Sequence, residues 1–200
     1  MKRIFKTKFN AACFVLIPVC IGINYVGKLF ASLLKLPLWL DSIGTCIGGV
    51  LGGPVIGGIC GAANNLIYGL TTGDSITLIY ALTSFGIGVA VGIMARLGRM
   101  KTFPGALLTA VAAGLTAVVI STPLNIIFWG GMTGNVWGDA VFAWSQAGKL
   151  PVFFGSFLDE VIVDVPDKLI TLLLVFAIVK NLPKKLTSLY DVDDEVESLD

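Results

Sequence analysis

The chain has 200 residues, of which 56% are hydrophobic and only 14% are charged, and its formal net charge is +1 at pH 7. A soluble domain carries about 25% charged residues, so this composition excludes a soluble globular protein and predicts an integral membrane protein. The nearly balanced charge gives no indication of a nucleic-acid partner, and the absence of histidine removes the commonest metal ligand and the usual general base.

The apolar stretches predict an all-α integral membrane protein, a six-transmembrane-helix bundle in one membrane domain. The length allows five or six spans at about 20 residues each. Residues 1–9 form a basic N-terminus, residues 10–185 the membrane domain, and residues 186–200 an acidic tail that we expect to be disordered. No small-residue cleavage site follows the first apolar run, so it is expected to remain as a span. The predicted spans are residues 10–34, 38–53, 54–70, 75–97, 103–129 and a sixth that ends near residue 182, preceded by a long outer segment over residues 130–149.

The basic residues are distributed unevenly between the two ends of these spans. Six spans put both termini and the connection between the fourth and fifth spans on one side. That side holds ten lysines and arginines, and the other side holds two, Lys35 and Lys149. Because basic residues concentrate on the cytoplasmic side, both termini are predicted to be cytoplasmic, in a multi-pass protein of the cell (plasma) membrane. The ten are Lys2, Arg3, Lys6, Lys8, Arg96, Arg99, Lys101, Lys180, Lys184 and Lys185.

Several enzyme motifs are absent from the sequence. There is no G-x-x-x-x-G-K-[ST] loop to hold ATP, and no H-E-x-x-H zinc motif is possible without histidine. The Gly-x-Gly-Asp context of an intramembrane aspartyl protease is approached only at Gly73-Asp74, which lacks the first glycine. The four cysteines lie in apolar stretches without C-x-x-C spacing, which is typical of small buried hydrophobes. The chain is therefore predicted not to be an enzyme and to need no cofactor or metal.

The stretch over residues 150–182 combines a long apolar run with ionisable side chains. Ionised groups at membrane depth are costly unless they are paired or face a polar cavity, so each is a functional candidate. Asp164 can reach Lys168 at i, i+4 on a helix. Pro166 is expected to kink the helix or to start a new one; in an alternative, residues 159–167 lie in an outer loop. The five ionisable residues are Asp159, Glu160, Asp164, Asp167 and Lys168, of which the last four fall on one broad helical face.

Polar side chains from other spans are biased toward the outer half of the bundle, where they could line one cavity with this face. Small-molecule sites combine apolar walls with a few fixed polar groups. Asp41 could instead be the N-cap of the second span. Three tryptophans could instead be interfacial belt residues: Trp129, Trp137 and Trp144. The predicted substrate-binding residues are Asp41, Asn65, Tyr80, Asn125, Trp129, Glu160, Asp164 and Lys168.

Small residues recur at the four-residue spacing that lets helix backbones approach closely. By default this spacing indicates packing inside the bundle, and one such face could instead dock a partner membrane protein. The predicted partner-docking residues are Ala11, Ala12 and Val15 in the first span and Gly57 and Gly61 in the third.

Three segments are similar to a known family. Residues 39–45 (WLDSIGT), 52–58 (GGPVIGG) and 64–67 (NNLI) resemble the substrate-binding (S) components of energy-coupling factor (ECF) transporters. The resemblance covers residues 10–185. It implies a subunit that captures a vitamin or related micronutrient on the outer side and associates with a membrane coupling subunit and two ATPases. ATP hydrolysis by these partners would topple the S component and release the substrate inside.

Two features depart from the pattern of that family. Its Ala-x-x-x-Ala docking motif is incomplete, because Ala11 is followed four residues later by Val15. The Asn and Lys that riboflavin-binding members carry after the sixth-span proline correspond here to Lys168 and Thr171. The substrate therefore stays open among vitamins, nucleobases and nucleosides.

Two other functions fit a polar membrane bundle. A multi-span sensor or scaffold protein also uses glycine-rich helices, and would normally continue into a cytoplasmic output domain. An ion-coupled small-molecule carrier would use the acidic residues as a relay, and the sequence shows no visible internal repeat of the kind many carriers have.

Overall fold

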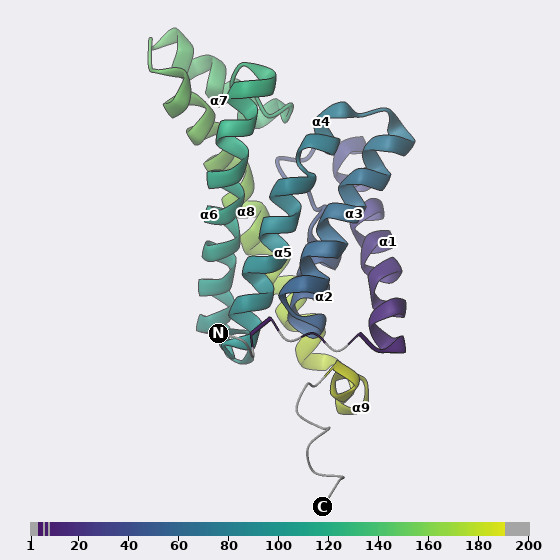
Figure 1. Ribbon diagram of the computed structural model, residues 1–200. Coiled ribbons are helices and arrows are strands. Elements are labelled where there is room, and N and C mark those ends of the chain that lie inside the picture. Colours follow the sequence, from purple (N-terminus) through teal and green to yellow (C-terminus); the bar gives the residue numbers. More distant parts are fainter. Residues whose placement is uncertain (1–3, 6, 8, 191–200) are drawn as a thin grey trace, which may run out of the picture.

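The computed structural model describes residues 4–5, 7 and 9–190, and these residues form helices without any strand (Figure 1). The predicted tail falls largely outside the described residues, and so does most of the basic N-terminus. The all-α class is confirmed. The helices are α1 (Ala11–Leu33), α2 (Ile43–Gly52), α3 (Pro54–Thr72), α4 (Ser75–Ile79), α5 (Ala81–Arg96), η1 (Arg99–Lys101), α6 (Phe103–Trp129), α7 (Val136–Ala147), α8 (Val152–Asn181), α9 (Lys184–Thr187) and η2 (Ser188–Tyr190).

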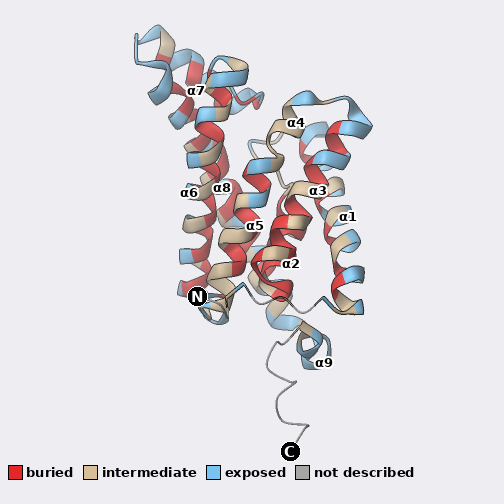
Figure 2. Ribbon diagram, viewed as in Figure 1, coloured by how far each residue is buried: buried red, intermediate tan, exposed pale blue. Residues whose placement is uncertain are grey.

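Two described helices, α1 and α6, are long and apolar enough to cross a membrane, and α2 and α5 are shorter apolar helices. The outward faces of the long helices carry large apolar side chains, such as Phe14 on α1 and Val119 on α6. The inward face of α6 carries small buried residues, including Ala106, Ala110 and Ala113. Figure 2 shows the buried and exposed faces of these helices. A pattern of apolar exterior and small-residue interior suits helices that pack closely inside lipid.

The helix α8 runs without interruption from Val152 to Asn181, with Pro166 inside it. The expectations that Pro166 starts a new helix, or that residues 159–167 form an outer loop, are therefore wrong. Proline removes one backbone hydrogen bond, but a long helix held by neighbouring helices tolerates that loss in membrane proteins. Pro166 faces outward, whereas Asp164 and Asp167 on either side of it are buried. The ionisable residues are thus held inside the bundle.

Two other predicted boundaries change. The stretch expected as one span over residues 75–97 is divided into α4 and α5 at Tyr80, and Asp74 caps the start of the short α4. The Asp74 carboxylate accepts hydrogen bonds from the amides of Ile76 at 3.0 Å and Thr77 at 3.3 Å. The outer segment over residues 130–149 contains the helix α7. Asn135 caps α7 as Asp74 caps α4, so in both places a polar side chain in a connection begins a short helix.

The helices α2 and α3 meet at a tight corner. Gly53 has φ +87°, which an L side chain rarely adopts, and Pro54 follows as the first residue of α3, where its missing amide hydrogen costs no helical bond. The four cysteines are buried as predicted, and they belong to the apolar core that α2 shares with its neighbours.

The glycines of α3 pack directly against α5. A Cβ added at Gly57 would lie 2.6 Å from the Gly88 carbonyl oxygen, and one at Gly61 would lie 2.3 Å from the Ser84 carbonyl oxygen. Because backbone occupies that space, neither contact can be relieved by a side-chain rotation. Gly57 and Gly61 are therefore packing residues inside the chain, and neither is available on an outer face to dock a partner.

We expect Gly61→Val to destabilise the protein by about 1–3 kcal/mol, the range usual for overpacked interiors, because α3 and α5 must separate. Gly22→Val is the matched control, since a Cβ at Gly22 on α1 has nothing within 4 Å. Unfolding in mixed detergent micelles measures both variants. Equal stability of the two would contradict the close α3–α5 packing.

Candidate functional site

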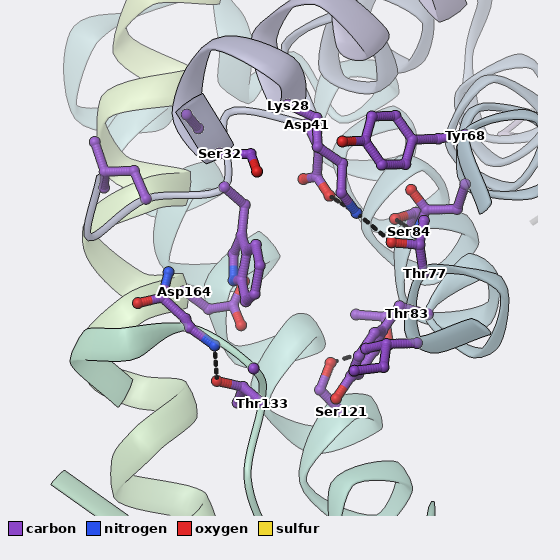
Figure 3. A pocket seen from close by; sticks show the side chains of 18 of the residues that line it. Lys28, Ser32, Asp41, Tyr68, Thr77, Thr83, Ser84, Ser121, Thr133 and Asp164 are labelled. Atoms are coloured by element: carbon purple, nitrogen blue, oxygen red, sulfur yellow. Dashed lines mark hydrogen bonds and ion pairs between the residues drawn. The ribbon is translucent and has the colours of Figure 1, made fainter. Parts of the chain in front are cut away.

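A cavity of about 360 Å³ lies at the end of the bundle that holds α4 and α7, away from α9 and the start of α1 (Figure 1). Its walls come from α1, α3, α4, α5, α6 and α8, from the first residue of α7, from Asp74 and Tyr80 on either side of α4, and from two connections, residues 34–42 and 130–135. Figure 3 shows Lys28, Tyr68 and Thr77 on one side of this cavity and Asp164 and Thr133 on another. The size falls at the lower end of the range typical of small-molecule sites.

The α8 wall carries Glu160, Asp164 and Lys168, which are one helical turn apart and buried. The Lys168 ammonium lies 3.1 Å from Asp164 Oδ1, which confirms the predicted i, i+4 pair. It lies closer still, at 2.5 Å, to Oδ2 of Asp167. Only 1% of Lys168 is exposed, so the ammonium is stable there because two carboxylates surround it.

Asp167 does not line the cavity, and its second oxygen faces the connection between α1 and α2. Asp167 Oδ1 accepts hydrogen bonds from the Trp39 amide at 3.1 Å and the Leu40 amide at 2.9 Å. Leu40 has φ +52°, which is unfavourable for a residue with a side chain. The two hydrogen bonds offset that cost and hold Trp39 at the cavity wall.

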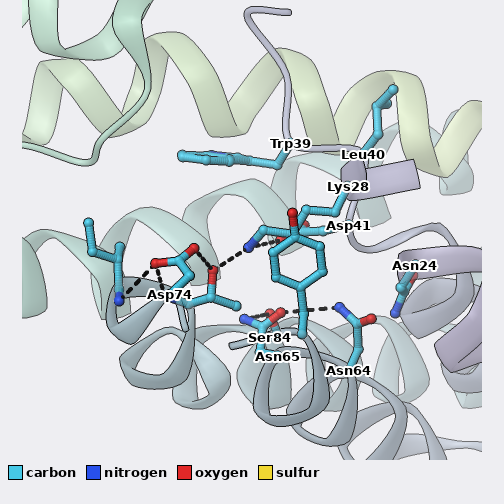
Figure 4. Close-up of polar contacts among 12 residues, drawn as sticks. Asn24, Lys28, Trp39, Leu40, Asp41, Asn64, Asn65, Asp74 and Ser84 are labelled. Carbon is cyan, nitrogen blue, oxygen red and sulfur yellow. Dashed lines mark hydrogen bonds and ion pairs between the residues drawn. The ribbon is translucent and has the colours of Figure 1, made fainter. Parts of the chain in front are cut away.

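The opposite wall is organised by Lys28 of α1 (Figure 4). The Lys28 ammonium donates to Thr77 Oγ1 at 2.8 Å and lies 3.8 Å from Asp41 Oδ2. It also lies over the Tyr68 ring, 4.9 Å from its centroid, and 5.9 Å from the Trp39 ring centroid. Aromatic faces attract cations, so these contacts stabilise the lysine within an apolar helix.

Thr77 links this lysine to a further carboxylate. Thr77 Oγ1 accepts from Lys28 and donates to Asp74 Oδ2 at 2.5 Å, while Asp74 caps α4. On α3, Asn65 donates to Ser84 Oγ at 2.9 Å and accepts from Asn64 at 3.2 Å. The cavity wall is thus built of polar groups whose orientation is fixed before any ligand arrives.

A chain of hydrogen bonds fixes Glu160 from behind. The Tyr80 hydroxyl donates to Asn125 Oδ1, and Asn125 Nδ2 donates to Glu160 Oε1 at 2.6 Å. Asn125 is fully buried and does not itself line the cavity. Its position behind Glu160 makes it a positioning residue for that carboxylate.

Six of the eight predicted site residues line the same cavity, and two lie outside its wall. Asn125 supports Glu160, and Trp129 lies at the end of α6. The alternative role of Asp41 as an N-cap is wrong, because Ser42 occupies the N-cap position of α2 and Asn24 Oδ1 accepts from the Gly44 amide at 2.6 Å. The lining residues predicted from the sequence are Asp41, Asn65, Tyr80, Glu160, Asp164 and Lys168.

Other wall residues were not predicted from the sequence. Lys28 carried a usable signal, because a lysine inside an apolar span needs a partner. Trp39, Tyr68, Thr77 and Thr133 carried no such signal, since aromatic and hydroxyl residues near helix ends are common at membrane interfaces. Asp74 follows a glycine at the start of a helix, where an acid is common as an N-cap. Of the predicted docking residues on α1, Ala11 and Val15 are exposed and Ala12 is half-buried.

A helical membrane bundle with a polar-lined cavity at one end defines a class of protein that binds small molecules within the membrane. Comparison of the sequence with models of known protein families identifies the family within this class. A family model described as "ECF transporter, substrate-specific component" matches residues 13–190, and the chain belongs to this family. It is therefore a membrane-embedded, substrate-binding subunit of an ECF transporter, and members of the family are transport proteins and not enzymes. Neither the curated proteins nor the solved structures contain a match to the chain.

Proposed function

We propose that the chain captures a vitamin or a related micronutrient from outside the cell for ATP-driven import. The observation that carries this proposal is the cavity, whose polar groups from α1, α3, α5 and α8 converge on one space large enough for a small organic molecule. Trp39, Tyr68 and Tyr80 add flat apolar surface to these groups. Aromatic walls with a few fixed donors and acceptors suit a compact ring-containing molecule.

The proposed partners are a membrane coupling subunit and two ATPases, with which the chain would form the complete importer. Family membership implies such an ECF module. The sequence has no G-x-x-x-x-G-K-[ST] loop, so the proposed energy source lies in the partner subunits. On α1, the exposed Ala11 and Val15 belong to a face that is free to contact a coupling subunit.

The proposed topology has six spans across the plasma membrane, with both termini in the cytoplasm and the cavity open to the outside. The connection between α5 and α6, which contains η1 (Arg99–Lys101), and the helix α9 (Lys184–Thr187) lie at the end of the bundle remote from the cavity and carry basic residues (Figure 1). Lys35 belongs to the cavity end. This distribution supports a cavity on the outer side, since basic residues favour the cytoplasm.

Cysteine labelling is expected to place Lys101 and Met132 on opposite sides of the membrane. Both positions are exposed, and the four native cysteines are buried, so a single introduced cysteine is the main reactive site. In intact cells, a membrane-impermeant maleimide should label Met132→Cys and not Lys101→Cys. Labelling of both from the outside would contradict the proposed topology.

Mass spectrometry of small molecules released from the purified protein tests the proposed function. Protein isolated from cells grown in rich medium should release a compound of micronutrient size in stoichiometric amount. If no compound were enriched over an unrelated membrane protein purified in the same way, the proposed capture function would be contradicted.

A further inference from the structure

The α8 wall has more carboxyl groups than ammonium groups. Lys168 is the one ammonium on this wall, and Asp164 at 3.1 Å and Asp167 at 2.5 Å share it. Glu160 is a third carboxyl group, only 2% exposed, and its closest hydrogen-bond partner is the neutral amide of Asn125 at 2.6 Å. In the part of the chain that the structure describes, no ammonium or guanidinium forms an ion pair with Glu160.

The other two lysines at the cavity do not correct this imbalance. Lys28 is engaged by Asp41, by Thr77 and by the ring of Tyr68 on the opposite wall. Lys35 is exposed in the connection after α1. The described lining therefore includes four carboxyl groups and three ammonium groups. Asp74 is half-buried and accepts hydrogen bonds from Thr77 and from backbone amides, so the buried carboxyl group of this lining that has no cation is Glu160. The lining carboxyl groups are Asp41, Asp74, Glu160 and Asp164, and the ammonium groups are Lys28, Lys35 and Lys168.

A buried carboxylate without a cation is costly at membrane depth, whereas a charge-assisted hydrogen bond to one is strong. Glu160 and Asp164 lie one helical turn apart on the same face, so a single positive nitrogen placed in the cavity could contact both. Asn125 and Tyr80 hold Glu160 in place for such a contact. The flat side chains of Tyr80 and Trp39, which also line the cavity, favour a ring that carries the positive charge.

We propose that the substrate is an organic cation or zwitterion whose positively charged nitrogen lies between the carboxylates of Glu160 and Asp164. This inference rests on the proposed capture function and narrows its substrate class. An anion without a positive group would meet the excess acid of this wall and bind weakly. A neutral ring of the same shape would gain the apolar contacts and could donate hydrogen bonds, but it would not form an ion pair with the two carboxylates.

A set of three probes with one ring and different charges tests this inference on the full-length protein in detergent. Benzamidine is a cation, benzamide is neutral and benzoate is an anion, and a probe that binds the folded protein more tightly raises the melting temperature more at the same concentration. We expect benzamidine to reach half of its effect at a concentration at least about tenfold lower than either of the others, as expected for a charge-assisted contact. Glu160→Gln should remove most of that preference while keeping the hydrogen bond from Asn125.

Asp159→Asn is the matched control. Asp159 is the neighbouring residue on α8, is also a buried carboxylic acid, but does not line the cavity. It should keep the preference for benzamidine. Asp164→Asn is the second test variant, and it should also weaken the preference for benzamidine. It provides the test if the Glu160→Gln protein does not fold.

The outcomes separate this inference from the function on which it rests. Equal or tighter binding of benzoate, or an unchanged preference in Glu160→Gln and Asp164→Asn, would overturn the cationic substrate and leave the small-molecule site intact. Absence of any shift with all three probes, in protein that also releases no small molecule, would overturn both.

Discussion

Replacing Lys168 by methionine is expected to lower the free energy of unfolding by about 3–5 kcal/mol, the usual cost of breaking a buried ion pair. Methionine fills similar space but leaves Asp164 and Asp167 without a cation, and Asp167 is completely buried. Reversible unfolding in mixed detergent micelles measures the loss. Lys180→Met is the matched control near the end of the same helix, where the ammonium lies over the Phe176 ring and a much smaller change is expected.

Double variants identify which of the two carboxylates contributes more to the stability provided by Lys168. Asp167→Asn combined with Lys168→Met should recover more stability than Asp164→Asn combined with Lys168→Met, because Asp167 lies closer to the ammonium and is more deeply buried. An asparagine at position 167 can still accept the hydrogen bonds from Trp39 and Leu40. Wild-type stability in the Lys168→Met protein, or equal recovery in the two doubles, would contradict the stabilising role given to the ion pairs of Lys168 with Asp164 and Asp167.

Filling the cavity is expected to abolish substrate binding. Ser121 on α6 is 2% exposed, lines the cavity and shares a hydrogen bond of 3.0 Å with Thr83. Ser121→Phe should place a ring where the substrate lies and weaken binding at least about 100-fold, which corresponds to about 2.7 kcal/mol. The amount of small molecule that co-purifies with the variant, compared with wild type, provides the measurement.

Val119→Phe is the control for this variant. Val119 lies two residues earlier on α6 and points outward, with 69% of its surface exposed. It adds a similar ring without entering the cavity, so the co-purifying compound should be retained. Retention of the compound by Ser121→Phe would place the substrate elsewhere.

The parts of the site that the sequence predicted are those set by local spacing. Asp164 and Lys168 are four residues apart, and a helix brings such residues together whatever surrounds it. The same reasoning predicted that Glu160 shares their face. Glycines at four-residue spacing on α3 predicted close helix approach, although the partner is α5 of the same chain and not another subunit.

The parts that escaped prediction depend on contacts between distant segments. Asp167 binds the backbone at Trp39 and Leu40, more than 100 residues away, and no local pattern specifies which loop a buried carboxylate will hold. Lys28 meets Thr77 only because α1 and α4 converge at the same end of the bundle. Asn125 was predicted as a wall residue and lies behind Glu160, because sequence spacing gives the face of a helix but not the depth of a side chain.

Uptake into sealed vesicles tests most directly whether the chain is the substrate-binding subunit of an importer. The compound released from the purified protein is supplied in radiolabelled form to vesicles that contain the chain alone, or the chain with the coupling subunit and both ATPases. We expect the chain alone to bind the compound without accumulating it, and the full set with ATP to concentrate it inside. Accumulation by the chain alone, without ATPases, would contradict this function.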